Sequence, residues 1–304
     1  MAENDKHPAN PDLAKIRERI DEIDERIQSL INERARFAQQ VGLSKGKLAS
    51  AVEYYRPERE AEVLRAIQAR NEGPIRDDEM LRLFREIMSA CLAQQEPLKV
   101  GFLGPEGTFT QTAVYKHFGH SVRALPFHTI DEIFHEVESG VADFGVVPIE
   151  NSTEGSVNNT LDMFLTSPLK IAGQNELKIE QHLLGSETGL DKIERICAHE
   201  QSLAQCRSWL REYLPHAELI GMSSNAAGAR RARDEAGTAA IGPAVAADVY
   251  DLEVLVSNIE DRADNATRFL VIGRKLLAAS GSDKTTILVS TSDTGEGAGV
   301  LHQL

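Results

Sequence analysis

Residues 141–162 read VADFGVVPIENSTEGSVNNTLD, and this stretch gives the first indication of the fold class. The apolar run from Phe144 to Ile149 predicts a buried strand. Seven small or polar residues, Glu150 to Ser156, follow it directly. In an open α/β sheet, ligands bind at the carboxyl ends of the strands. The stretch therefore predicts an α/β protein with a ligand site at the end of this strand.

Apolar strands alternate with helical patterns throughout the segment after Pro97. A first set of strands is expected near residues 100–103, 122–127 and 145–149, and a second near residues 177–184, 195–198, 217–220 and 239–241. This alternation predicts a mainly parallel, doubly wound sheet. The two sets predict two α/β lobes with a cleft between them.

The segment before Pro97 has the period of helices. One apolar stripe recurs at steps of three and four residues and predicts a helix from Asp12 to about Val41; it consists of Leu13, Ile16, Ile20, Ile23, Ile27, Leu30, Phe37 and Val41. Gly42 is expected to loosen the end of this helix. Pro57 predicts the start of a second helix, and Asp77 and Asp78 are expected to cap a third. Three helices cannot cover so long a stripe, so a second copy of the chain is expected against it.

Composition excludes several classes of protein. The net charge of −14 argues against nucleic acid as a partner. No apolar run is long enough to span a membrane and the amino terminus is polar, so we expect a cytosolic protein without a membrane partner. The three cysteines, Cys91, Cys197 and Cys206, have no metal-ligand spacing and are expected to be reduced thiols. No metal site and no cofactor are predicted.

Arg34 is unusual because it lies on the apolar stripe, one turn from Leu30 and Phe37. A buried guanidinium needs an anion, which could be a structural partner such as Glu33 or Asp24, or a ligand. Other charged residues on the predicted helices favour a pocket for a small dicarboxylate; these are Arg17, Lys45, Arg59 and Glu60.

These positions resemble the all-helical chorismate mutases over residues 12–95. The matching residues are Arg17, Arg34, Lys45, the pair Arg59 and Glu60, and Gln95. The resemblance implies a three-helix, intertwined dimer that binds chorismate. Arg17 from the partner subunit and Arg34 would hold its carboxylates, Lys45 and Gln95 would donate to its ether oxygen, and Glu60 would lie near its hydroxyl. Arg59 is implied as a further substrate-binding residue. Such a [3,3] rearrangement needs a held substrate conformer and fixed donors, and neither a nucleophile nor a metal.

Two positions depart from the mutase pattern. Many members have an Asp where this chain has Arg56, and often a Ser where it has Cys91. These departures leave the contact to the substrate hydroxyl to Glu60 alone.

Polar motifs follow several of the predicted strands in the second segment. They are the loop Gly104 to Thr108, the run Glu150 to Ser156, the stretch His199 to Ser202 with Gln205 beyond it, and the run Asp264 to Phe269. Each alone could be a helix cap or a solvated loop. Their joint occurrence at strand ends indicates one shared site.

Together these motifs resemble prephenate dehydratase from about Lys99 to Arg274, including its Thr-Arg-Phe triplet. The resemblance implies two lobes around a cleft, like the periplasmic binding proteins. Loss of water and carbon dioxide from prephenate requires a proton donor for the leaving hydroxyl. The implied donor is Thr267, with Glu150 as the alternative acid. The implied substrate contacts are Asn151, Ser152, Gln205, Arg268, Phe269 and Thr108.

Residues from Lys284 onward resemble the beginning of an ACT domain. A strand is expected from Thr285 to Ser290 and a helix start at Val300. In this family the module binds phenylalanine, and the chain stops at Leu304. Regulation by phenylalanine is therefore expected to be weak or missing.

The sequence thus predicts a multidomain chain in three parts: a helical mutase domain (1–96), a dehydratase domain (97–277) and an incomplete ACT-like domain (278–304). The whole resembles the bifunctional chorismate mutase/prephenate dehydratases of phenylalanine biosynthesis. A homodimer acting on chorismate and prephenate is expected. Two alternatives stay open: a dehydratase whose helical segment serves only as a dimerisation arm, and a non-catalytic two-lobed protein that binds a small carboxylate.

Overall fold

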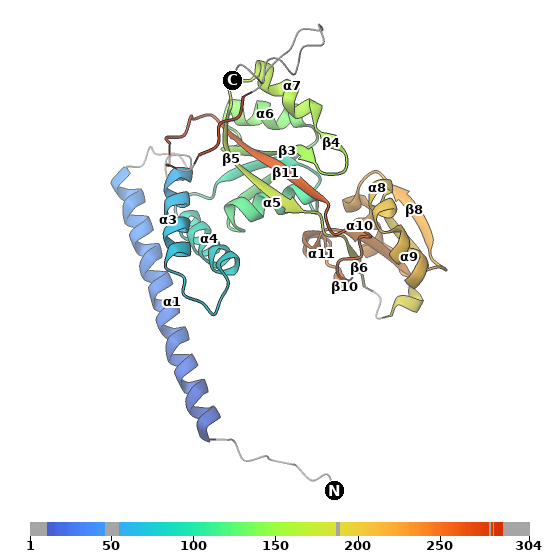
Figure 1. The fold of residues 1–304 in the computed structure, drawn as a ribbon, viewed down its shortest axis with the longest axis horizontal. Helices are drawn as coiled ribbons and strands as arrows, with labels where there is room; N and C mark the ends of the chain where they lie inside the picture. Colours follow the sequence, from blue (N-terminus) through green and yellow to red (C-terminus); the bar gives the residue numbers. More distant parts are fainter. Residues whose placement is uncertain (1–10, 46–54, 187–188, 280, 282, 288–304) are drawn as a thin grey trace.

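The computed structural model describes residues 11–45, 55–186, 189–279, 281 and 283–287. Three helices come first: α1 (Pro11–Lys45), α3 (Pro57–Ala69) and α4 (Asp77–Ala93). Helix α1 projects far beyond the rest of the molecule, while α4 packs against both α1 and α3 (Figure 1). The predicted helical segment is therefore confirmed.

Two details of the helix ends differ from the sequence-based expectation. The residue before α4 is Arg76, and neither Asp77 nor Asp78 caps the helix from outside; both lie in its first turn, where carboxylates favour the helix dipole. Gly42 lies inside α1 and does not end it. A Cβ atom there would lie 2.5 Å from the side-chain oxygen of Gln95, so glycine serves a close approach of Gln95 to α1.

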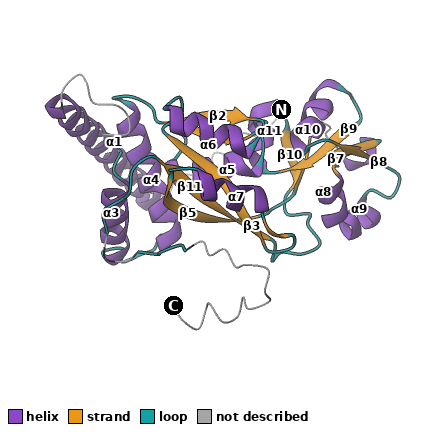
Figure 2. Cartoon of the chain, turned by 90° about the horizontal axis from the view of Figure 1, so that it is seen from above, coloured by secondary structure: helices purple, strands orange, loops and turns teal. Residues whose placement is uncertain are grey.

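The first lobe is a six-stranded sheet with helices on both faces (Figure 2). Its strand order is β2-β1-β3-β11-β5, with β4 paired to β3. The elements are β1 (Lys99–Leu103), α5 (Phe109–Phe118), β2 (Arg123–Phe127), α6 (Ile130–Ser139), β3 (Phe144–Asn151), β4 (Gly155–Ser156), α7 (Asn158–Thr166), β5 (Lys170–Lys178) and β11 (Ala266–Gly273). One core cluster lies under α5 and another under α6 and α7.

The second lobe is a five-stranded sheet of order β10-β6-β9-β7-β8. Its elements are β6 (His182–Gly185), a 3₁₀ turn (Leu190–Lys192), β7 (Arg195–His199), α8 (Glu200–Gln205), α9 (Arg207–Tyr213), β8 (Glu218–Met222), α10 (Asn225–Asp234), β9 (Thr238–Gly242), α11 (Ala244–Tyr250) and β10 (Glu253–Val256). The two-lobed α/β prediction is confirmed.

The prediction of mainly parallel sheets is wrong. Strand β11 runs antiparallel to both β3 and β5, and β6 runs antiparallel to both β9 and β10. The single strand expected over 177–184 is two strands in different lobes, because the chain crosses between lobes after Lys178. It crosses back before β11, so a strand from the end of the second lobe completes the first sheet. The alternation of strands and helices in the sequence does not predict that β11 returns to the first sheet.

The expected ACT strand falls mostly outside the described residues. Thr285, Thr286 and Ile287 are described and form neither helix nor strand, and residues 288–304 are not described. In the part of the chain that is described, no helix is long and apolar enough to cross a membrane.

Candidate active sites

Thr267 and Asn151 form the centre of the site at the end of β3. They are register partners on β11 and β3, and the Asn151 amide Nδ2 donates to Thr267 Oγ1 over 2.8 Å. The amide is oriented by its other end, since Asn151 Oδ1 accepts from the backbone N–H groups of Thr153 and Glu154. A hydroxyl carries one donor and two acceptor positions. Because Thr267 accepts from Asn151, its own O–H is left to donate.

Ser152 and Asn265 complete this network. Ser152 Oγ accepts from Ala266 N (2.9 Å) and donates to Asn265 Oδ1 (3.2 Å). Asn151 Nδ2 also lies 3.1 Å from that Asn265 oxygen. The network joins the two strand ends, so the position of Thr267 is fixed by side chains from both.

Glu150 and Arg268 form a second cross-strand pair. Arg268 Nη2 lies 2.5 Å from Glu150 Oε2, with the side chains 46% and 49% exposed. Successive strand residues point to opposite faces, so this pair and the Asn151–Thr267 pair lie on opposite sides of the sheet. A carboxylate held against a guanidinium accepts hydrogen bonds. Both observations argue against Glu150 as the proton donor to a substrate that Thr267 contacts.

Gln205 lies across from this network, at the end of α8. A cavity of 330 Å³ separates the lobes, lined from the first lobe by Thr153, Glu154 and Asn265 and from the second by Gln201, Gln205 and Asp261, among others. Gln181 Nε2 donates to Gln205 Oε1 over 2.9 Å. The oxygen of Gln205 is occupied by this bond, so its amide N–H groups are the ones that can serve a ligand.

Thr108 is the residue before α5, and its hydroxyl lies 3.3 Å from Leu103 O. The loop that precedes it contacts the second lobe, since Tyr250 on α11 donates to Glu106 O over 2.9 Å. Gly107 has φ +80°, and a Cβ atom there would lie 2.7 Å from the Tyr250 ring. The loop is thus a contact between lobes. No hydrogen bond joins Thr108 to Asn151 or Thr267 in the described residues.

The sequence-based assignment of Phe269 as a substrate contact is wrong. Its side chain is 2% exposed and belongs to the core cluster under α5, with Phe102 and Val271. The register irregularity next to this position places its extra residue, Ile149, on β3 and leaves the alternation along β11 unbroken. Phe269 therefore anchors β11 and does not line the cleft.

The helical segment holds the second candidate site. Arg34 is half-buried and Arg17 is exposed on α1, and neither has an ion-pair partner among the described residues. The alternative of a structural ion pair for Arg34 is thus not found there. Arg59 pairs with Glu62 on its own helix (2.9 Å). Lys45 is the last residue of α1, and its side chain lies outside the described part.

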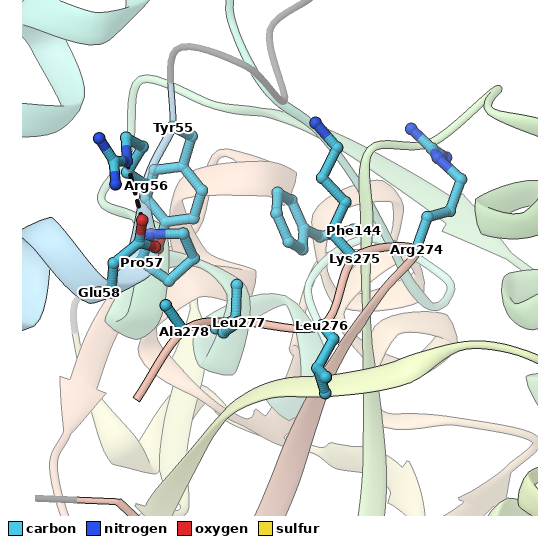
Figure 3. A pocket seen from close by; sticks show the side chains of 10 residues that line it. All are labelled: Tyr55, Arg56, Pro57, Glu58, Phe144, Arg274, Lys275, Leu276, Leu277 and Ala278. Carbon is cyan, nitrogen blue, oxygen red and sulfur yellow. Dashed lines mark hydrogen bonds and ion pairs between the residues drawn. The ribbon is translucent and has the colours of Figure 1, made fainter. Parts of the chain in front are cut away.

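The carboxylate of Glu60 in the helical segment has both a cation and a hydrogen-bond donor beside it. Its carboxylate lies 3.6 Å from Arg85 Nε on α4 and accepts a hydrogen bond from the Tyr55 hydroxyl. Burial raises the pKa of Glu60, and Arg85 and Tyr55 oppose that rise. Arg56 points away and pairs with Glu58 (2.8 Å; Figure 3). Although this chain has Arg56 where many mutases have an Asp, Glu60 still has Arg85 and Tyr55 as partners.

Gln95 contacts α1 directly. Its Nε2 donates to Ala38 O over 2.8 Å, and its Oε1 is buried with no hydrogen-bond partner in the described residues. The amide thus lies on the inner side of α1, close to Gly42. Cys91, one turn earlier on α4, is 2% exposed and is a packing residue.

Sequence reasoning missed several residues that hold these sites. The sequence contains Asn265 in one of the polar motifs, and it predicts no role for Gln181, Arg85 or Tyr55. Gln181 lies inside the strand expected over 177–184, between the polar residues Glu180 and His182, so its polarity alone does not single it out. Tyr55 and Arg85 meet Glu60 only through tertiary packing, which no spacing in the sequence encodes.

Comparisons with known proteins agree with this division of the chain. A model of the prephenate dehydratase family matches residues 100–276, and a model of chorismate mutase type II matches residues 16–96. The bifunctional chorismate mutase/prephenate dehydratase of Stutzerimonas stutzeri is 52% identical over 297 residues, covering 96% of this chain and 80% of that protein. The protein of the same description from Aquifex aeolicus is 42% identical, covering 93% and 78%.

A solved structure of prephenate dehydratase from Arthrobacter aurescens, in complex with L-Phe, is similar with a TM-score of 0.53 and 36% identity. The similarity covers 59% of this chain and 61% of that chain. Sequence and structure thus agree, and the chain belongs to the family of bifunctional chorismate mutase/prephenate dehydratases.

Proposed function

We propose that this chain catalyses two consecutive reactions, chorismate to prephenate on α1, α3 and α4, and prephenate to phenylpyruvate in the cleft between the lobes. Family membership supports the pair of activities. The observation that supports the second assignment is the hydrogen bond from Asn151 to Thr267, because a hydroxyl that accepts from Asn151 keeps its own proton to donate.

In the proposed dehydratase step, Thr267 donates a hydrogen bond or a proton to the departing ring hydroxyl. A free threonine hydroxyl is a weak acid, so it acts here as a positioned donor that the Asn151 amide polarises. Gln205 would donate to the substrate from the opposite lobe, and Asn265 and Ser152 would hold the network rigid. As the ring C–O bond and the C–C bond from the ring to its carboxylate break, the electron pair of the C–C bond enters the ring, which becomes aromatic. Carbon dioxide leaves, and the hydroxyl leaves as water with one proton, supplied through Thr267 and replaced from solvent.

In the proposed mutase step, Arg34 and Arg59 bind carboxylates of chorismate, and Gln95 and Lys45 donate to the ether oxygen. The half-buried position of Arg34, which has no ion-pair partner among the described residues, supports this role because such a cation is suited to an anionic ligand. Glu60 would accept from the substrate hydroxyl. The substrate would be held compact while charge develops on the ether oxygen.

We propose further that the mutase site needs a second copy of the chain. The residues of the stripe from Leu13 to Val41 are 41% to 60% exposed on α1, which is far more apolar surface than a helix leaves open to water. An intertwined dimer would bury this stripe and bring Arg17 of one chain to the site of the other.

The division of the chain near residues 97 and 277, and the ACT-like character of residues 278–304, stay proposals. The limits of the two family matches, 16–96 and 100–276, support the first. The resemblance of the segment from Lys284 to Ser290 supports the second.

A coupled assay tests the whole proposal. Purified chain supplied with chorismate should form prephenate and then phenylpyruvate, and supplied with prephenate should form phenylpyruvate alone. Conversion of prephenate without any conversion of chorismate would support the dimerisation-arm alternative. Binding of prephenate without turnover would support the binding-protein alternative and contradict the proposal.

A further inference from the structure

Tyr55 belongs to the helical segment by sequence, yet its ring lies in the core of the first α/β lobe. It is 9% exposed and belongs to the cluster under α5. Its centroid lies 5.5 Å from that of Phe118 and 5.4 Å from that of Phe144, the latter edge to face. Both partners come from the dehydratase domain, so one side chain of the helical segment is anchored by the other domain.

Figure 3 shows the surroundings of this ring. Tyr55 and Phe144 face a common cavity of 580 Å³, whose other wall includes Arg274 and Leu277. Because open space borders Tyr55 on this side, the position of its ring depends on Phe118 and Phe144.

The hydroxyl of Tyr55 points the other way, to the mutase candidate site. It donates a hydrogen bond to the carboxylate of Glu60 on α3, which also faces Arg85 Nε at 3.6 Å. That nitrogen of Arg85 is buried and has no hydrogen-bond partner in the described residues. At 3.6 Å the ion pair with Arg85 is long for a hydrogen bond, so the Tyr55 hydroxyl helps to fix the direction of the carboxylate.

We propose that Tyr55 is a positioning residue of the mutase site, with its ring held by the dehydratase core and its hydroxyl orienting the Glu60 carboxylate. This inference rests on the proposed role of Glu60 toward chorismate. It makes the geometry of one active site depend on the packing of the other domain.

The charged groups around Tyr55 and Glu60 determine which residue's pKa appears in the pH dependence of mutase activity. Glu60 is faced by Arg85 and Tyr55, and Tyr55 by Glu60, Arg85 and Glu58. Arg85 also faces His117 on α5, whose pKa burial lowers to about 4, so His117 is neutral well above that pH. An acid limb of mutase activity above about pH 5 therefore reports Glu60 and not His117.

The first experiment compares the pH dependence of mutase kcat/KM in the wild type, Tyr55→Phe and Tyr115→Phe. Loss of the donor should destabilise the charged carboxylate and raise the pKa of Glu60, so the acid limb should move up by about one pH unit. Tyr115 is the matched control: its ring stacks on His120, which binds Glu86 of α4, but its hydroxyl accepts from Gln111. Its variant should keep the wild-type mutase profile.

A merely structural role of Tyr55 would lower the activity without moving the acid limb, and that result would overturn the proposal. The Glu60→Gln variant shows whether the inference about Tyr55 fails alone or together with the proposed role of Glu60. If Glu60→Gln leaves mutase activity unchanged, the role of Glu60 is wrong and the inference about Tyr55 falls with it. If Glu60→Gln is impaired and Tyr55→Phe retains the wild-type profile, only the inference is wrong.

The second experiment tests whether mutase activity depends on the packing of the Tyr55 ring against the dehydratase domain. Phe144→Leu removes the edge-to-face partner of Tyr55 from the dehydratase domain and should lower mutase kcat/KM by about threefold to tenfold. Phe134→Leu is the matched control, because Phe134 is also buried but lies in the other core cluster of the same lobe. Equal effects of the two variants on mutase activity would contradict the link through Tyr55.

Discussion

The two candidate active sites differ in how completely one chain builds them. Around Thr267, hydrogen bonds join Asn151 to Thr267, Asn151 to Asn265 and Ser152 to Asn265 across the ends of β3 and β11. On the helices, Arg17 and Arg34 have no ion-pair partner among the described residues, and the stripe beside them is exposed. We therefore propose that the dehydratase site is preorganised within one chain, whereas a second chain and the ligand complete the mutase site.

The largest effect is expected from Thr267→Ala, which removes the positioned donor. Dehydratase kcat should fall by about 10²–10⁴-fold, the usual contribution of a proton donor, while mutase activity stays normal. Steady-state kinetics with prephenate and with chorismate measure both. Thr267→Ser keeps the hydroxyl and should retain most of the activity. A near-normal dehydratase rate in the alanine variant would remove Thr267 from the mechanism.

Arg34→Ala should impair the opposite activity. Loss of a charge-assisted contact to a carboxylate should lower mutase kcat/KM by about 100-fold and leave prephenate turnover unchanged. Arg36→Ala, which changes an exposed arginine on the same helix, is the control and should have no effect. Loss of both activities in the Arg34 variant would indicate misfolding and would not support the assignment.

A charge in the middle of the exposed stripe tests whether the mutase site needs a partner. Ile23→Glu should weaken self-association, because each subunit loses about 1.5–3 kcal/mol of apolar burial and buries a carboxylate. At low protein concentration mutase activity should fall by about tenfold, with dehydratase activity retained. Sedimentation at several concentrations gives the oligomeric state. An unchanged assembly would refute the dimer through α1.

The smallest effect is expected from Gln181→Leu, which removes the support of Gln205. The dehydratase KM should rise by about fivefold, as for loss of one neutral hydrogen bond. Stability should not fall much, because the substitution also removes a buried oxygen that has no partner in the described residues. The melting temperature and KM together check this. A large loss of stability with unchanged KM would assign Gln181 to packing alone.

Local patterns predicted the helices and most strands, because their periods are set by neighbouring residues. Helix α1 and strand β3 both fall where the periodicity placed them. The strand order of the first sheet was not predictable in this way. Strand β11 joins it after the whole second lobe, and its antiparallel direction follows from that long return.

The candidate sites could also be predicted from the sequence only in part. The polar motifs at strand ends predicted that Asn151 and Thr267 meet, and they do. The resemblance assigned the last residue of the Thr-Arg-Phe triplet to the site, yet Phe269 is a core residue. Glu60 was placed on its helix by sequence, but its partners Tyr55 and Arg85 depend on how α3, α4 and the first lobe pack together.

If one chain carries two separate active sites, two variants that each lack one site should complement each other when they are mixed. Thr267→Ala supplied with chorismate should accumulate prephenate, and Arg34→Ala supplied with chorismate should form almost no product. An equimolar mixture should convert chorismate to phenylpyruvate, because each variant retains the site that the other lacks. If the mixture forms no phenylpyruvate, and each variant is folded but inactive in both half-reactions, the chain does not carry two separate sites.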